Sequence, residues 1–214
     1  MTDDKRAYPA SLSVDYPDRE LNRLTSFFRL IVIIPIGVIL YLVSGAVYRS
    51  GDESQWVVAI SAGGVLFLAT MLMLVFRQKY PRWWFDWNIA LTKFSIRVGA
   101  YLALLRDEYP STDEDQAVHI EIPYPDAKKD LNRWLPLVKW FLAIPHYIIL
   151  FFLGIAAVFV VIITWFAILF TGRYPKGLFD FVVGVMRWSL RVMAYAALLT
   201  TDEYPPFTLG EQAE

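Results

Sequence analysis

Three long runs of apolar residues constrain the fold of this chain more than any other feature. Residues 27–47, 56–76 and 137–170 are almost free of charged side chains. A membrane-spanning helix needs about 20 mostly apolar residues, because the hydrocarbon core of a bilayer is roughly 30 Å thick. The first two runs meet this length, and the third is long enough for a tight hairpin of two shorter arms around Gly154. Together with a hydrophobic content of 57%, the runs predict an all-α membrane protein.

The sequence also repeats itself, which predicts two units, residues 1–110 and 111–214. The repeated motifs flank the apolar regions and are Tyr-Pro-Asp, Leu-Asn-Arg, Tyr-Pro, Phe-Asp, Arg-Val and Asp-Glu-Tyr-Pro. Each unit is expected to hold a membrane-spanning hairpin and a following charged helix. The expected elements are spans at about 27–47 and 56–76 and a helix at about 83–105 in the first unit, and a hairpin at about 137–170 and a helix at about 178–199 in the second.

A hairpin returns to the side of the membrane from which it started, so the two units are expected to be parallel repeats. On this topology all of the 20 lysines and arginines except Arg49 lie on the side of the termini. An excess of positive charge marks the cytoplasmic face, so both termini are predicted to be cytoplasmic. Residues 11–15 and 118–122 alternate apolar and polar side chains, which predicts short extramembrane strands that pair with each other.

The two charged helices carry equivalent stripes of side chains. These stripes are Asp86, Lys93 and Arg97 in the first unit and Asp180, Arg187 and Arg191 in the second. Residues spaced by seven and eleven positions lie within about 20° of one line along a helix. Two cations near the centre of a spanning helix would be unfavourable, so both helices are predicted to lie in the membrane interface as basic amphipathic helices bound to anionic headgroups. Alternatively, several copies assemble with the stripes facing a pore or vestibule that favours anions.

Other polar positions lie within or beside the apolar runs. Arg29 and Lys139 are near the cytoplasmic ends of their helices, where long side chains reach lipid headgroups. Pro35 and Pro145 each remove one backbone donor and are expected to kink their helices. His146 follows the second proline and is a candidate polar site within the membrane, although such a histidine can simply bond across a helix bundle.

Catalytic motifs are absent from the sequence. We find no glycine-rich phosphate loop, no histidine pair at metal spacing and no cysteine. Neither a cofactor nor a metal is therefore expected, and the net charge of −1 argues against nucleic acid as a partner. An enzyme that acts on lipid would have to use Asp86 or Asp180 as a base, and it is the weakest of the alternatives.

The second unit resembles a bacterial membrane-protein family, domain of unknown function 4389. The matching segments are Trp134-Leu135-Pro136-Leu137-Val138-Lys139-Trp140, Ala143-Ile144-Pro145-His146, Trp165 to Pro175, Gly177 to Phe181, Arg187-Trp188, Arg191-Val192 and Asp202 to Phe207. The first unit resembles a diverged relative, with Ile36 in the place of His146. The resemblance implies a location in the bacterial inner membrane and no known activity.

These observations predict a non-enzymatic integral membrane protein, a scaffold or an accessory subunit of a membrane complex. It is expected to bind anionic lipid through its basic interfacial helices and to associate with other membrane subunits or with itself. A homo-oligomeric pore or transporter is the alternative.

Overall fold

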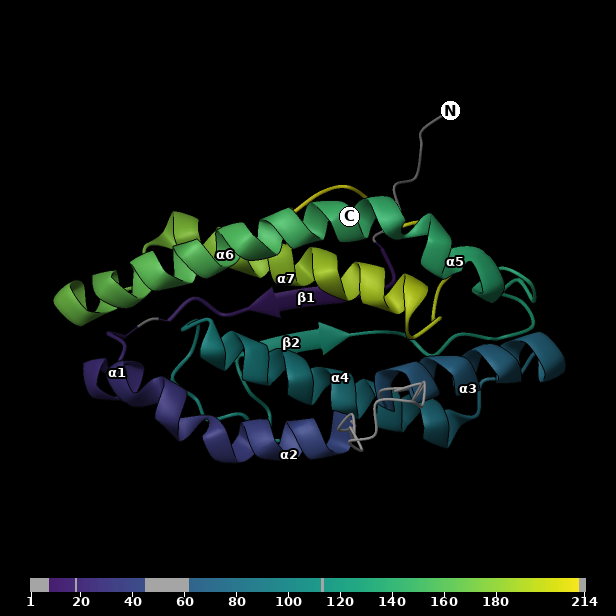
Figure 1. Ribbon diagram of the computed structural model, residues 1–214, viewed down its shortest axis with the longest axis horizontal. Coiled ribbons are helices and arrows are strands. Elements are labelled where there is room, and N and C mark those ends of the chain that lie inside the picture. Colours follow the sequence, from purple (N-terminus) through teal and green to yellow (C-terminus); the bar gives the residue numbers. More distant parts are fainter. Residues whose placement is uncertain (1–7, 18, 45–61, 113, 212–214) are drawn as a thin grey trace, which may run out of the picture.

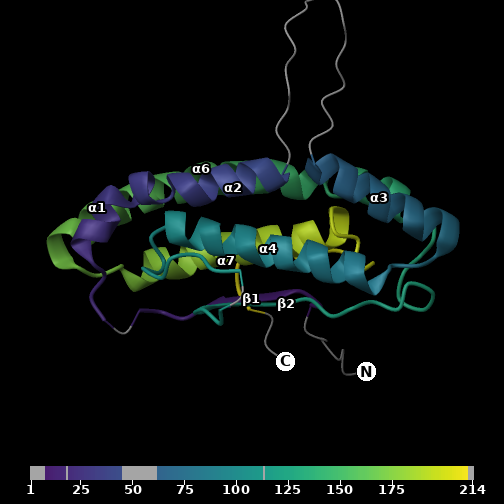
Figure 2. The ribbon, with the colours of Figure 1, turned by 90° about the horizontal axis from the view of Figure 1, so that it is seen from below.

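The computed structural model describes residues 8–17, 19–44, 62–112 and 114–211, which form three layers (Figure 2). The outer layer contains α1 (Arg23–Val32), α2 (Ile34–Ser44), α3 (Ala62–Arg77), α5 (Pro136–Leu142) and α6 (Ile144–Thr171). The middle layer contains α4 (Arg82–Leu102) and α7 (Lys176–Ala196), and the third contains the strands β1 (Ser11–Val14) and β2 (Val118–Glu121). The described part of the chain is thus mostly helical, with one small sheet.

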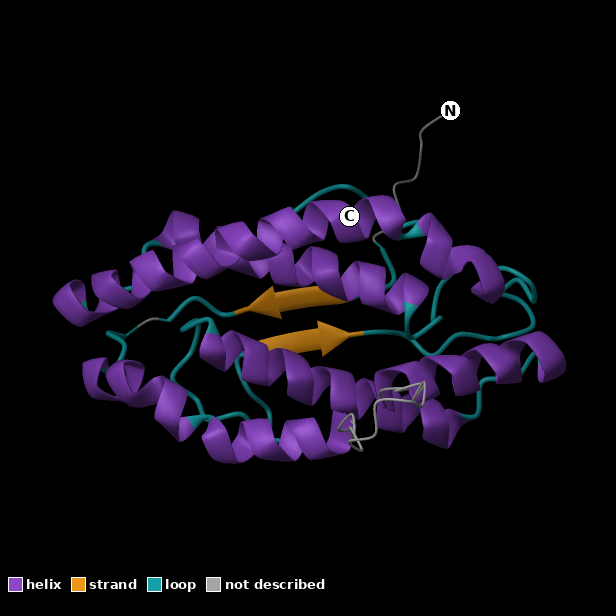
Figure 3. Ribbon diagram, in the orientation of Figure 1, coloured by secondary structure: helices purple, strands orange, loops and turns teal. Residues whose placement is uncertain are grey.

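The two strands form an antiparallel ribbon at the centre of the molecule (Figure 3). Leu12 lies opposite Ile120, and both side chains are buried. Side chains alternate between the two faces of a strand, so this register turns Leu12 and Ile120 toward the helices and leaves His119 and Glu121 exposed on the outer face. The predicted strands and their pairing are confirmed.

Both predicted proline kinks are present. The axes of α1 and α2 differ by 41° across the break at Ile33, just before Pro35. The helix is broken in the same way at Ala143, before Pro145. A proline ring lacks the N–H that would continue the helix and collides with the carbonyl four residues earlier, which explains both breaks.

The hairpin predicted within residues 137–170 is wrong. The structure has one continuous helix, α6, of 28 residues through Gly154. A helical glycine is unfavourable by only about 1 kcal/mol relative to alanine, whereas a turn would leave several backbone groups without partners on each side of it. Among the described residues, α6 is the one unbroken helix long and apolar enough to cross a membrane, and α1 with the start of α2 passes the same test as a bent pair. The expected span at 56–76 lies partly outside the described residues, and its described part, α3, is shorter.

The helices predicted at 83–105 and 178–199 exist as α4 and α7, but they occupy the middle layer rather than the surface. α7 packs against α6 on one side and β1 on the other, and most of its residues are buried. Its Gly184 allows Leu209 of the C-terminal segment to approach closely, since an added Cβ would lie 2.9 Å from the Cβ of Leu209. α7 is therefore a core helix, because apolar side chains cover most of its circumference.

The two halves of the chain hold each other through equivalent contacts. Tyr16 donates a hydrogen bond to the carbonyl of Tyr174, and Tyr124 donates one to the carbonyl of Tyr80. The hydroxyl of Tyr80 in turn donates to the carbonyl of Leu198 at 3.0 Å. Figure 1 shows the consequence: β1, from the first half, lies beside α7, and β2, from the second half, lies beside α4.

Candidate functional site

Arg29 and Lys139, predicted to reach lipid headgroups, are buried in ion pairs inside the protein. The guanidinium of Arg29 pairs with Asp107. The Nζ of Lys139, which is fully buried, lies 2.6 Å from Oδ1 of Asp202 and donates to the carbonyl of Thr201 at 2.6 Å. Both carboxylates belong to the repeated Asp-Glu-Tyr-Pro motif. The two cations therefore have protein partners in place of the expected lipid.

The same carboxylates also hold the segments that lead into the outer layer. Asp107 accepts a hydrogen bond from the backbone N–H of Asn22 at 2.7 Å, and Asp202 accepts one from that of Asn132 at 2.5 Å. Burial lowers the pKa of the Lys139 ammonium, and Asp202 acts in the opposite direction. We interpret both ion pairs as structural latches that fasten the end of each unit to its beginning.

The cations of the α7 stripe face the ribbon and the C-terminal segment. Arg187 donates to the carbonyls of Leu12 at 2.9 Å and Leu209 at 3.0 Å, and its Nη2 lies 2.5 Å from Oε1 of Glu211. Arg191 donates to the carbonyls of Thr208 and Gly210, at 3.4 and 3.0 Å. Five of the six side-chain nitrogens of these two arginines thus bond within the protein, away from the outer layer.

In the α4 stripe the two cations differ. Arg97 donates to the carbonyl of Ser111 at 2.8 Å. This contact resembles that of Arg191 with Gly210, because each arginine bonds to the segment that follows its own helix. Lys93, the counterpart of Arg187, is half-buried and makes no ion pair or hydrogen bond with any residue that the structure describes. Lys93 is therefore a cation whose charge the described protein does not balance.

Lys93, Arg187 and Arg191 line one open cavity of about 960 Å³ between the ribbon, α4 and α7. Apolar side chains from the strands and helices share this lining with Tyr8 and two acidic residues. The described lining residues are Tyr8, Pro9, Ala10, Ser11, Leu12, Ser13, Ile89, Lys93, Ile120, Glu121, Ile122, Pro123, Arg187, Arg191 and Glu211. The cations of the stripes that the sequence predicted on two separate surface helices are therefore brought together, except for Arg97, around a single cavity.

Positive charge dominates this cavity. Three cations and two carboxylates line it, and Glu211 pairs with Arg187, whereas Glu121 is exposed and makes no ion pair with these cations in the described structure. Burial lowers the pKa of the Arg191 guanidinium, and the nearby charge of Arg187 lowers it further. The Nε of Arg191 is buried and has no hydrogen-bond partner in the described structure.

His146 lies in an aromatic cluster and not in the cavity. Its ring is fully buried, stacks on Phe207 with centroids 4.0 Å apart, and accepts a hydrogen bond at Nδ1 from Nε1 of Trp188 at 3.1 Å. This arrangement places the imidazole proton on Nε2, which has no partner among the described residues. The packing role that the sequence left open for His146 agrees with these contacts.

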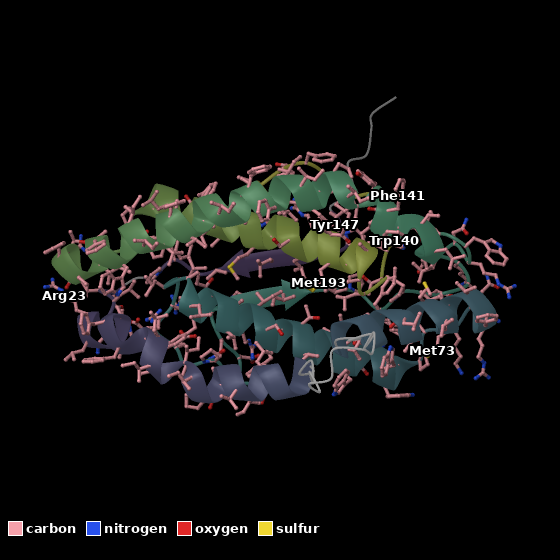
Figure 4. All side chains as sticks on the ribbon, in the orientation of Figure 1. Arg23, Met73, Trp140, Phe141, Tyr147 and Met193 are labelled. Atoms are coloured by element: carbon pink, nitrogen blue, oxygen red, sulfur yellow. The ribbon has the colours of Figure 1, made fainter. Side chains whose placement is uncertain are left out.

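The outer layer has an apolar outer surface, which the sequence analysis did not predict as a single surface formed by five helices. Large apolar side chains are exposed along all five of its helices, including Leu30 (74%), Phe76 (71%) and Phe170 (79%). Figure 4 labels Trp140, Phe141 and Tyr147 along α5 and the start of α6, and Arg23 at the opposite end of the molecule. An extended apolar surface of this kind marks an interaction site.

No catalytic arrangement is found in the described part of the chain. No group of three or more histidine, aspartate and glutamate side chains is placed to hold a metal ion within those residues. Asp86 forms an exposed ion pair with Arg82 at 3.1 Å, and Asp180 is exposed at the surface of α7. Neither aspartate lines the cavity.

Comparison with known proteins gives one match. Residues 134–208, which run from just before α5 to the segment after α7, match the family described as Domain of unknown function (DUF4389). No curated protein and no solved structure matches the chain.

Proposed function

We propose that this chain is a non-enzymatic membrane protein, a scaffold or accessory subunit, whose outer layer lies in the hydrocarbon of one leaflet. The observation that carries the proposal is the one-sided distribution of exposed apolar side chains. Most of them lie on α1, α2, α3, α5 and α6, and fewer lie on the middle layer, such as Trp83 and Trp87 of α4. The ribbon on the opposite side exposes Ser11, Ser13, His119 and Glu121. Fully removing one such leucine, isoleucine or phenylalanine from water stabilises by about 1.5–3 kcal/mol, so the whole surface would bind a bilayer strongly.

In this arrangement α6 lies along the membrane rather than across it. The ribbon lies two layers below α6, with α7 between them, and in projection it falls near the middle of the length of α6 (Figures 1 and 2). A crossing along the α6 axis would therefore place the polar face of the ribbon inside the hydrocarbon, where each unsatisfied polar group is unfavourable by several kcal/mol. Moreover, 28 residues at 1.5 Å each give α6 a length of about 42 Å, more than the roughly 30 Å of the hydrocarbon core.

We assign the protein to the bacterial cytoplasmic membrane, with both termini in the cytoplasm. The family match and the excess of lysine and arginine in the segments outside the apolar runs support this location. We also propose that the chain is a tandem duplication. The equivalent pairs Arg29 with Asp107 and Lys139 with Asp202, and the reciprocal tyrosine contacts, support it.

The pore alternative has less support. A pore would need the basic stripes to face an open passage between copies, but Arg187 and Arg191 are held by carbonyls of their own chain on the side away from the apolar surface.

The orientation of α6 can be tested by measuring the depth of spin labels. The chain has no cysteine, so single cysteines can be placed at Phe152, Phe159 and Phe166, which are exposed and spaced by seven residues on one face of α6. In lipid vesicles, an in-plane helix gives three similar depths within the hydrocarbon. A spanning helix would put the label at Phe159 about 10 Å deeper than the other two. A label at Ser13 serves as the control and should be accessible to water.

A label at Phe159 that lies about 10 Å deeper than those at Phe152 and Phe166 would refute the in-plane arrangement. Three labels at Phe152, Phe159 and Phe166 that all remain accessible to water would refute membrane insertion of the outer layer.

A further inference from the structure

The cavity beneath the ribbon collects cations from both halves of the chain. Lys93 comes from α4, and Arg187 and Arg191 come from α7. Because β1 belongs to the first half and lies on α7, the cavity forms only when the two halves interlock. Its position at the seam between the repeats makes it a feature of the duplicated chain that one unit alone would not possess.

The cations in this cavity exceed the acids that face it. Among the described lining residues there are three cations and two carboxylates, Glu121 and Glu211. Glu211 neutralises Arg187 and Glu121 is exposed, while Arg191 is bonded only to main-chain carbonyls and Lys93 has no polar partner. Arg191 is 3% exposed and keeps one buried N–H without an acceptor. Buried charge without a partner is unfavourable, and an anion that enters the cavity would remove this penalty.

Comparison of Lys93 with Arg187 strengthens the point. The two residues occupy equivalent positions in the repeat, and Arg187 is occupied by the carbonyl of Leu12 and by Glu211. Ile120 is the equivalent of Leu12, yet Lys93 donates no hydrogen bond to its carbonyl, and nothing described replaces Glu211 on this side. Lys93 is thus free to bind a ligand, whereas Arg187 has a structural role.

We propose that this cavity binds a phosphate group, with Lys93 and Arg191 as its principal cationic contacts. Phosphate presents several acceptor oxygens to donors that come from different directions, as an ammonium on one helix and a guanidinium N–H on another do here. The volume of about 960 Å³ and the apolar side chains of Leu12, Ile89 and Ile120 leave room for an apolar part of the ligand. The group can come from a soluble phosphate compound or from a phospholipid headgroup.

This inference is independent of membrane anchoring. The binding of phosphate can be measured on the full-length protein in mild detergent, and failure of the depth measurement on α6 would leave that result untouched.

The test compares wild-type protein with Lys93→Met, Lys93→Arg and Lys128→Met. Lys128 is an exposed lysine outside the cavity, so its substitution removes the same charge elsewhere. Calorimetric titration of the protein in detergent with inorganic phosphate measures binding of a soluble phosphate. Native mass spectrometry of the protein reconstituted in nanodiscs with phosphatidylglycerol or phosphatidylcholine measures how much of each phospholipid the protein retains.

We expect Lys93→Met to weaken phosphate binding by about tenfold or more, Lys93→Arg to restore most of it, and Lys128→Met to leave it unchanged. If wild-type protein ignores inorganic phosphate but retains phosphatidylglycerol in a manner that depends on Lys93, the proposal stands and the source is lipid. Absence of both kinds of binding, or equal losses in Lys93→Met and Lys128→Met, would overturn it.

Discussion

Asp202→Asn is expected to destabilise the protein by about 3 kcal/mol. The substitution keeps the shape of the side chain but removes the negative charge that lies 2.6 Å from the fully buried Nζ of Lys139. Breaking a buried ion pair from one side typically destabilises by 3–5 kcal/mol, because the remaining charge has no counter-ion. The side chain of Asp202 is 23% exposed, so water can partly replace it and the lower end of this range applies.

Thermal unfolding in detergent at a fixed scan rate measures this effect. For a chain of this size, about 3 kcal/mol corresponds to a fall in Tm of roughly 6–12 °C. Asp180→Asn is the matched control, because Asp180 is exposed and forms no ion pair in the described structure, and its Tm should change by less than about 2 °C. The double variant Lys139→Met with Asp202→Asn should recover much of the loss, since it leaves no uncompensated charge.

The loss of stability should also depend on pH. Burial lowers the pKa of Lys139, so at alkaline pH the folded protein holds fewer protons than the unfolded chain, and stability rises with pH toward the unfolded pKa of about 10.4. Asp202 raises that pKa, and its removal extends the window to lower pH. The deficit of Asp202→Asn should therefore shrink between neutral pH and pH 10. Equal Tm values for the Asp202 and Asp180 variants, or a deficit that does not change with pH, would refute this account.

Two further predictions concern the backbone and the contacts between the halves. Gln78 directly follows α3 and has a positive φ of 44°, whereas the equivalent position of the second unit is Gly172, with a φ of 73°. Because glycine adopts positive φ without strain, Gln78→Gly should stabilise the protein by about 0.5–1 kcal/mol and Gly172→Ala should destabilise it. Both effects are measured as changes in Tm. A lower Tm for Gln78→Gly would contradict this reasoning. Tyr16→Phe and Tyr124→Phe each remove one hydrogen bond between the halves and should each destabilise by about 0.5–1.5 kcal/mol in chemical denaturation. No loss in either variant would show that these bonds contribute nothing to the interlocked fold.

Local patterns in the sequence predicted several elements well. The alternation at 11–15 and 118–122 predicted both strands, and Pro35 and Pro145 predicted both helix breaks, because each signal acts through the backbone of its own segment. The charged helices were also found within a few residues of their ends.

The errors arose where long segments pack against one another. The composition of a run such as 137–170 is compatible with a hairpin and with one long helix. Only the contacts of α6 with α7 and α1 favour the continuous helix. The basic stripes of α4 and α7 suit a membrane interface or a protein interior equally, because phosphates and main-chain carbonyls satisfy the same donors. In the structure carbonyls of the C-terminal segment accept hydrogen bonds from both arginines of α7, whereas Lys93 of α4 has no partner among the described residues.

The sequence by itself determined the helical class, the apolar character, the repeated motifs and the positions of the cations, since these depend on composition and on spacing within one segment. The tertiary structure alone decided that Arg29 and Lys139 pair with Asp107 and Asp202, and that Lys93, Arg187 and Arg191 share one cavity. The physical reason is that the two ion pairs join residues 63 or more positions apart, and that Lys93 is more than 90 positions from the two arginines. Which distant groups meet is chosen by the packing of whole layers, and no local propensity encodes it.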